Sequence, residues 1–488
     1  MQTEERQLKK SLGLFDSTAI VMGSMIGSGI FIVSADMSRN LGSPGWLLVA
    51  WLLTGVLTIF AALSYGELAA MMPKAGGQYV YLREAYNPLV AFLYGWTLFL
   101  VIQTGTIAAV GMAFAKFLGV LVPWFSETNI ILQIGFMKIN TVHLPAILSI
   151  VLLTYINTRG INTGKIIQNF FTYIKFFVLL LFIVVGLLIV KNTGAWELNT
   201  GVFWHAQSIG PNGVALPIEG FAIIIALGTA MVGSLFSSDA WNNLTFTAGE
   251  VINPKKNIPL SLFIGTIGVT IIYILANIVY IKVLPLRGDP HGLTALQQGI
   301  QFASNDRVGS ASMSMLLGDN AAIVMAAFIM ISTFGCNNGL ILSGARVYYA
   351  MAADKLFFTK TGELNNRNVP AKGLMFQCIW ACLLCLSGTY SNLLDYVIFA
   401  VLIFYVLTIA GVFILRVKKT DAERPYKTFG YPAVPALYII LASTMMIILF
   451  IYKPNYSWPG LIIVLLGVPV YFIRKWIDKK DKRQMNLS

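Results

Sequence analysis

The stretch that decides the fold is Gly23-Ser24-Met25-Ile26-Gly27-Ser28-Gly29-Ile30-Phe31, which lies in the first long apolar segment of the chain. From residue 23 to residue 29, three of the seven residues are glycine and two are serine. Such a stretch can unwind at low cost inside a membrane, and its freed N–H groups then need a polar or anionic partner. Taken alone, it also fits close helix packing through small residues. A broken helix would instead present an electropositive N-terminus to a carboxylate.

A second polar interruption, Ser237-Ser238-Asp239-Ala240-Trp241-Asn242-Asn243, lies in the sixth apolar segment. An acidic residue within a membrane helix normally faces a cavity or a partner. Interruptions at corresponding positions of two repeats indicate the substrate site of a transporter. The pair suits a zwitterion, because N–H groups of one break could bind its carboxylate while carbonyls and Asp239 receive its ammonium.

The composition identifies a membrane protein. Of 488 residues, 57% are hydrophobic and 11% are charged, whereas a soluble chain carries roughly 25% charged residues. The apolar runs are long and continuous, which favours helices over an outer-membrane barrel. We therefore predict an all-α polytopic membrane protein with 12 transmembrane helices, in which the first ten form a 5+5 inverted repeat with broken helices 1 and 6. The predicted spans are residues 15–37, 44–71, 88–119, 143–157, 165–190, 216–247, 258–284, 318–352, 373–388, 392–416, 433–452 and 457–475.

The distribution of basic residues predicts the orientation. The net charge is +13, and most lysines and arginines fall in the loops on one side, which the positive-inside rule assigns to the cytoplasm together with both termini. The charge is thus a topology signal, and nucleic-acid binding is not expected. The predicted regions are a cytoplasmic tail (1–14), the first repeat (15–190), an external loop (191–215), the second repeat (216–416), the last two spans with the cytoplasmic loop before them (417–475) and a basic cytoplasmic tail (476–488).

Enzymatic and metal chemistry have weak support in the sequence. Cys382 and Cys385 form a C-x-x-C pattern, but they lie in an apolar helix without further ligands nearby. We therefore interpret them as small hydrophobic residues. No cluster of His, Asp, Glu and Cys stands out at a membrane surface. We expect no catalytic residue, no metal and no cofactor.

Like Asp239, Lys175 is a charged residue inside a predicted span, and the distribution of basic residues among the loops does not explain it. It follows Lys165 by ten residues, about 15 Å into the fifth span at 1.5 Å per residue. A buried lysine is costly unless it is paired or neutral, so a functional role is expected. Its ammonium could take the place of a coupling cation between the first span and the hydroxyls of Ser332 and Thr333. Alternatively, it could lose and regain a proton during coupling.

Several separated motifs together resemble the L-amino-acid transporter family of the amino acid–polyamine–organocation (APC) superfamily, which includes the light chains of heteromeric amino acid transporters. They are Gly27-Ser28-Gly29-Ile30-Phe31, Pro73-Lys74-Ala75-Gly76-Gly77-Gln78-Tyr79, Trp241-Asn242, Asn253-Pro254-Lys255-Lys256-Asn257-Ile258-Pro259 and Gly467-Val468-Pro469-Val470-Tyr471-Phe472. The likeness covers nearly the whole chain.

The resemblance implies a LeuT-like fold and sodium-independent transport, usually by exchange of one amino acid for another. The backbone of residues 27–29 would bind the α-carboxylate, and the carbonyls of Met25 and Phe236 would take the α-amine. Phe236 would also act as a gate, Asn242 would line the side-chain pocket, and Lys175 would stand in the vacated sodium position. The candidate substrate-binding residues are Met25, Ile26, Gly27, Ser28, Gly29, Phe236, Ser237, Asp239, Trp241 and Asn242, and the candidate coupling residues are Lys175, Ser332 and Thr333.

Two departures from the family pattern shape the remaining expectations. Ser238 replaces an aromatic residue that family members often have, and Asp239 resembles the acidic residue of members that accept cationic as well as neutral substrates. Residues 120–142 contain no cysteine, so a disulfide-linked heavy chain is not expected. We predict a stand-alone bacterial homologue in the cell membrane, monomeric or weakly oligomeric.

The leading functional hypothesis is a sodium-independent exchanger of neutral L-amino acids. The alternatives are a proton-coupled symporter in which Lys175 titrates, and an exchanger that also accepts cationic amino acids through Asp239. A channel would be expected to repeat its polar lining or to assemble rings, and this sequence has only the two breaks.

Overall fold

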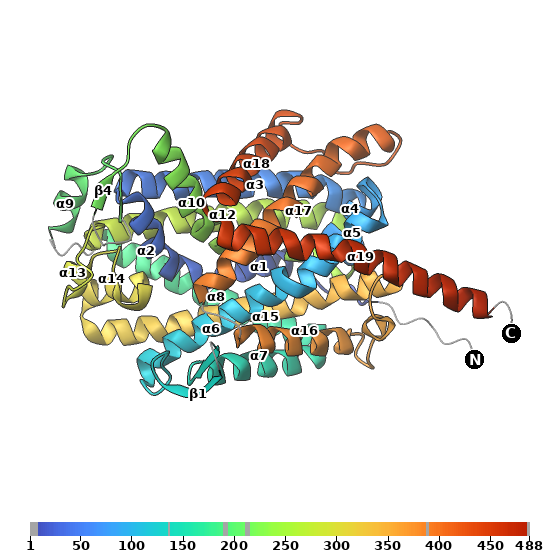
Figure 1. Ribbon diagram of the computed structural model, residues 1–488, viewed down its shortest axis with the longest axis horizontal. Helices are drawn as coiled ribbons and strands as arrows, with labels where there is room; N and C mark the ends of the chain where they lie inside the picture. Colours follow the sequence, from blue (N-terminus) through green and yellow to red (C-terminus); the bar gives the residue numbers. More distant parts are fainter. Residues whose placement is uncertain (1–7, 135–136, 189–193, 210–214, 387–389, 486–488) are drawn as a thin grey trace.

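The computed structural model describes residues 8–134, 137–188, 194–209, 215–386 and 390–485. The chain forms a bundle in which α3, α12 and α15 run along the long axis of the molecule while α6, α17 and α18 cross it obliquely, and α19 extends beyond the bundle at one end (Figure 1). The elements of the first half are α1 (Leu14–Met25), α2 (Gly29–Leu41), α3 (Pro44–Met71), α4 (Gln78–Ala85), α5 (Pro88–Thr97), the π-helix η1 (Leu98–Ile102), α6 (Gln103–Leu121), β1 (Ile130–Ile134), β2 (Met137–Asn140), α7 (His143–Thr158) and α8 (Ile161–Leu188).

The second half begins with short elements and continues with long helices. They are α9 (Ala195–Gly201), β3 (Gln207–Ile209), β4 (Ala215–Pro217), α10 (Phe221–Ser237), α11 (Asn243–Phe246), η2 (Ala248–Glu250), α12 (Pro254–Val283), α13 (Ala295–Gln298), η3 (Ser304–Asp306), α14 (Val308–Leu317), α15 (Asp319–Ala353), η4 (Thr359–Gly362), α16 (Ala371–Cys385), α17 (Tyr390–Lys418), α18 (Ala433–Tyr452) and α19 (Pro454–Met485).

Local sequence explains where several of these helices begin. Ser43 and Asn87 each precede a proline, and their side-chain oxygens accept hydrogen bonds from the N–H groups of Trp46 and Val90. Such capping satisfies a donor that has no partner within the helix, while proline suits the first helical position because it has no N–H to satisfy. The starts of α3 and α5 are therefore encoded locally.

The polytopic helical class is confirmed. Within the described ranges, nine helices are long and apolar enough to cross a membrane, counting α1 and α2 as one broken span. The other three predicted spans coincide with shorter apolar helices, namely α7, α10 and α16. A total of twelve crossings remains a prediction.

The segments between the spans contain structure that the sequence analysis missed. Strands β1 and β2 form an antiparallel hairpin between α6 and α7, and β3 and β4 form a second one before α10. Since residues 215–217 belong to β4, the sixth helical segment begins at Phe221, five residues later than the predicted span.

Candidate functional site

The first helix break lies at the predicted glycine–serine stretch. Helix α1 ends at Met25, Ile26 leaves helical geometry at ψ 90°, and α2 begins at Gly29. Residues 25–29 are all buried. Unwinding a buried helix leaves carbonyl and N–H groups that need partners, so the surroundings of this break determine its chemistry.

Lys175 supplies partners to the carbonyls on one side of the break. Its Nζ donates to the carbonyl oxygen of Gly23 and, at 2.9 Å, to that of Ile26, and it lies 3.5 Å from the carbonyl oxygen of Ser332. The side chain comes from α8 and is 2% exposed. Within the described residues, no carboxylate lies within ion-pair distance of it. A fixed ammonium thus sits among backbone oxygens, as a bound cation would.

The two hydroxyls expected beside Lys175 behave differently from one another. Ser332 Oγ donates to the carbonyl oxygens of Ile26, at 3.2 Å, and Gly27, at 3.5 Å. Thr333 Oγ1 bonds carbonyls of its own helix, those of Ile329 and Met330. Ser332 therefore contacts the first break, while the hydroxyl of Thr333 is hydrogen-bonded within α15.

The second break follows the end of α10. Helix α10 ends at Ser237, Ala240 adopts a left-handed backbone with φ 65°, and the short helix α11 begins at Asn243. The carbonyl of Phe236 accepts hydrogen bonds from the N–H groups of Ser238 and Asp239. This carbonyl, expected to receive an α-amine, is thus already engaged by two N–H groups within the turn, and a substrate amine would have to compete with them for its two lone pairs.

The two breaks lie directly against each other. A Cβ placed on Gly29 would lie 2.0 Å from Ser237 Oγ and 2.8 Å from Ser237 Cβ, so only glycine fits at the start of α2. The hydroxyl of Tyr273 in α12 lies 2.9 Å from the carbonyl oxygen of Met25 and 3.1 Å from that of Ser237. Tyr273 therefore joins both breaks through one hydroxyl, and the sequence analysis did not find it.

Asp239 points toward α17. Its Oδ1 accepts a hydrogen bond from Tyr405 Oη at 2.5 Å. Around this bond, the ring of Trp241 packs edge-on against Tyr65, with centroids 4.8 Å apart, and is tilted against Tyr405 at 5.3 Å. Trp241 is 2% exposed. The indole is thus held in place by aromatic neighbours beside the second break.

Asn242 connects the second break to α4, a short helix that was not predicted. Its Nδ2 donates to Gln78 Oε1 at 3.0 Å, and Gln78 Nε2 donates to Thr408 Oγ1 at 3.0 Å. The approach requires Gly77, whose φ is 42° and whose added Cβ would lie 2.3 Å from Thr245 Oγ1. The Gly76-Gly77-Gln78 stretch was noted only as a family motif, yet its glycines allow the backbone contact that brings Gln78 to the break.

Two cavities adjoin Asp239, and Tyr405 lines both of them. The first lies among α5, η1, α6, α11 and α17 and includes Gln78, Tyr94 and Asn242. The second lies among α3, α10, α17 and α18. Of the described residues that line them, none belongs to 25–29. Several residues of the second break thus line a cavity, and Asp239 lines both.

The described residues offer little to a metal ion. No group of three or more His, Cys, Asp and Glu side chains among them could hold one. The polar groups at the breaks are instead backbone N–H and carbonyl groups, hydroxyls, one carboxylate and one ammonium. Such a set offers both hydrogen-bond donors and acceptors to a small polar molecule.

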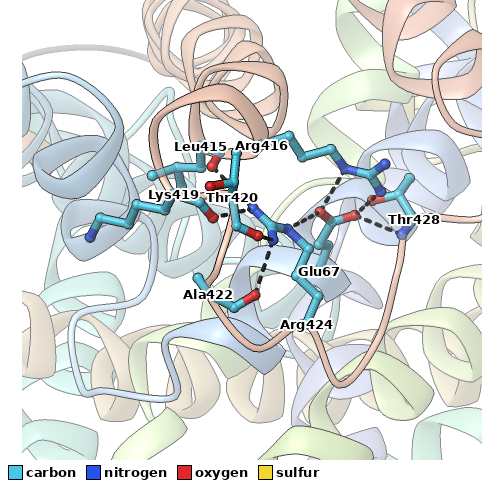
Figure 2. Close-up of polar contacts among 8 residues, drawn as sticks. All are labelled: Glu67, Leu415, Arg416, Lys419, Thr420, Ala422, Arg424 and Thr428. Atoms are coloured by element: carbon cyan, nitrogen blue, oxygen red, sulfur yellow. Dashed lines mark hydrogen bonds and ion pairs between the residues drawn. The ribbon is translucent and has the colours of Figure 1, made fainter.

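A separate ion-pair cluster lies at the end of α3 that is predicted to face the cytoplasm (Figure 2). Glu67 is 1% exposed and accepts two hydrogen bonds from Arg416, at 2.9 and 2.7 Å, and one from the Thr428 N–H at 2.8 Å. Arg424 Nε lies 3.6 Å from the same carboxylate. This Glu67 cluster joins α3 to the end of α17 and to the loop before α18.

A second, more exposed set of charges lies near that cluster. Lys419 and Arg83 hydrogen-bond to the Glu84 carboxylate at the end of α4, at 2.6 and 3.2 Å, and they hold the pKa of Glu84 below its usual value. Arg83 also pairs with Asp354 beyond the end of α15, which raises the pKa of Arg83. Helix α4 is therefore fixed by charge at one end and by Gln78 at the other.

Comparison with known proteins identifies the family of this chain. Residues 12–473 match the family described as amino acid permease. The chain is 31% identical to the mouse large neutral amino acids transporter small subunit 2, covering 97% of this chain and 83% of that protein. It is 27% identical to the human b(0,+)-type amino acid transporter 1, covering 96% and 88%, and 28% identical to the mouse Asc-type amino acid transporter 1, covering 98% and 84%.

Proposed function

This chain belongs to the amino acid permease family, and from that premise we propose that it is a sodium-independent exchanger of neutral L-amino acids that works by alternating access. The relatives are transporters of amino acids by name, which supports amino acid transport as the general activity. The observation that carries the finer proposal is Lys175, whose ammonium is bound by carbonyl oxygens of the first break.

Lys175 bears on sodium independence through simple electrostatics. A sodium ion in a protein is held mainly by oxygen atoms, and the carbonyls of Gly23 and Ile26 already face the ammonium of Lys175. A second positive charge a few ångströms away would be repelled strongly at low dielectric constant. A transporter with a fixed charge at this place has no need of a mobile cation to stabilise the break.

The direct contact of the two breaks supports a substrate site formed by both of them, within a LeuT-like 5+5 inverted repeat. In this proposal, the N–H groups at residues 27–29 bind the α-carboxylate at the start of α2, where the helix dipole is positive. The carbonyls at Met25 and Phe236 receive the α-amine, and Asn242 contacts the substrate side chain. Phe236 closes the site, and Lys175 with Ser332 holds the first break in its unwound form.

Uptake into proteoliposomes tests the exchange mechanism. Vesicles preloaded with unlabelled amino acid should take up labelled alanine, serine or leucine in sodium-free buffer, while empty vesicles should take up little. Equal uptake by empty vesicles without any gradient would refute exchange, and a requirement for sodium would refute the role given to Lys175.

Proton-coupled symport is the second candidate, and the observation favouring it is the burial of Lys175 without a carboxylate partner among the described residues. Such an amine can lose its proton at moderate cost. An inward pH gradient should then drive uptake into empty vesicles, and the Lys175→Ala variant should lose this response. A pH gradient without effect on the wild-type protein would dismiss this candidate.

We also propose that the chain works in the cell membrane, with both termini in the cytoplasm and without a disulfide-linked partner chain. The basic loops support the orientation, and the lack of cysteine in residues 120–142 supports the second point. Wider acceptance of cationic amino acids through Asp239 is the remaining alternative.

A further inference from the structure

We propose that Tyr405 sets the charge selectivity of the substrate site by occupying the carboxylate of Asp239. This inference rests on the proposed transport of amino acids and concerns which side chains the site accepts. With the hydroxyl in place, the site favours neutral side chains. Without it, Asp239 is free to bind a cationic one.

The geometry of Tyr405 carries the proposal. Its hydroxyl donates to Asp239 Oδ1 at 2.5 Å, a length typical of strong hydrogen bonds from a hydroxyl to a carboxylate. The ring is held by its neighbours, since it packs edge-on against Tyr65 with centroids 5.8 Å apart and leans on Trp241 at 5.3 Å. The hydroxyl oxygen cannot move away from Asp239 without displacing these buried aromatic rings.

The carboxylate has few other means of stabilisation. No ion pair of Asp239 with a lysine or arginine is found among the described residues. A carboxylate buried in apolar surroundings without a counter-charge is expensive, and each hydrogen bond to it lowers that cost. Tyr405 is therefore the group that a substrate ammonium or guanidinium must displace or join in order to reach this oxygen.

The places of Asp239 and Tyr405 in the two cavities also favour this role. Asp239 and Tyr405 line both cavities beside the second break, so the bond between them forms part of the boundary between the two spaces. A substrate side chain that extends past Asn242 meets this boundary. A neutral side chain finds a carboxylate that is already satisfied, while a cationic one must compete with the hydroxyl.

The test compares uptake of labelled lysine and leucine by proteoliposomes containing the wild-type protein or the Tyr405→Phe variant. The phenylalanine keeps the ring and its packing and removes only the hydroxyl. The ratio of lysine to leucine uptake should rise about tenfold or more in the variant. The Tyr405→Phe/Asp239→Asn double variant should lose this rise, because the freed group is then no longer charged.

Tyr348→Phe is the matched control. Tyr348 is a buried tyrosine of α15 that lines neither cavity, and its hydroxyl has no hydrogen-bond partner among the described residues, so its removal should leave the ratio unchanged. A structural defect in either phenylalanine variant would lower uptake of both amino acids and leave their ratio as it was.

The outcomes separate this inference from the proposed function. If the wild-type protein carries no amino acid at all, the proposed function fails. If wild-type and Tyr405→Phe proteins both carry leucine with the same ratio of lysine to leucine, the role of Tyr405 is refuted while transport stands. Uptake of lysine and leucine at equal rates by the wild-type protein would also refute it.

Discussion

Replacing Gly29 with alanine should separate the two helix breaks and weaken substrate binding. The added methyl group would lie 2.0 Å from Ser237 Oγ, 2.8 Å from Ser237 Cβ and 3.0 Å from Ser237 Cα. The hydroxyl can rotate, but it would then lose its 2.9 Å hydrogen bond to the carbonyl of Gly233. The Cβ and Cα cannot move without the backbone, so α2 and α10 must part by several tenths of an ångström.

The expected cost follows from this overlap. Forcing a methyl group into a packed site costs about 1–3 kcal/mol. If the whole cost falls on the assembled site, the affinity for the substrate drops by roughly fivefold to 150-fold, since every 1.4 kcal/mol is about tenfold. If it falls on the fold instead, the free energy of unfolding drops by the same amount.

Two measurements on purified protein distinguish these results: equilibrium binding of labelled leucine and the midpoint of thermal unfolding. Gly268→Ala is the control, because a Cβ there meets only Met22 Cε at an ordinary 3.5 Å and a helical alanine is about 0.5–1 kcal/mol better than glycine. The Gly29→Ala/Ser237→Gly double variant should recover part of the loss. Wild-type affinity and stability in Gly29→Ala would show that the two breaks are not in contact.

Three further outcomes are expected. Tyr273→Phe should cost about 1–3 kcal/mol of stability, because it removes the one hydroxyl proton that the carbonyls of Met25 and Ser237 share; chemical unfolding measures this cost. Glu67→Ala should cost about 3 kcal/mol of stability, because it leaves partly buried guanidinium groups unpaired. Lys255→Ala, at an exposed ion pair, should cost less than about 1 kcal/mol. Equal losses of stability in the two variants would contradict the role of the cluster. Folding lowers the pKa of Glu84, so the unfolded form binds more protons at acid pH. The ion pairs of Glu84 therefore stabilise the fold above the usual glutamate pKa. This contribution is lost as the pH falls through the pKa of the folded form. Lys419→Ala should reduce that dependence in a series of melting curves from neutral to acid pH, and an unaltered series would refute it.

The positions of both breaks could be predicted because they depend on local chemistry. Glycine and serine between residues 23 and 29 weaken a helix wherever they occur, and a carboxylate at residue 239 is costly in any membrane helix. The helices ended at Met25 and Ser237, inside the predicted interruptions. Lys175 is likewise buried within α8, and its depth in the membrane stays a prediction.

The partners of these groups could not be predicted, because each depends on how distant segments meet. Tyr273 and Tyr405 look like ordinary aromatic residues of apolar helices, and nothing in their neighbours along the chain indicates that their hydroxyls reach the breaks. Ser332 and Thr333 are adjacent in sequence, but successive residues of a helix point in different directions, about 100° apart. Only Ser332 faces the first break, and Thr333 bonds its own helix instead.

The Glu67 cluster limits the ways in which this molecule can change shape. Parting α3 from the end of α17 would leave a carboxylate that is 1% exposed without the guanidinium groups that neutralise it, a state several kcal/mol higher in energy. The low-energy route keeps the two ends together and lets the deformation occur at weaker places, such as the unwound residues of the two breaks. A pair of spin labels on either side of the cluster should therefore report one unchanging distance throughout the transport cycle.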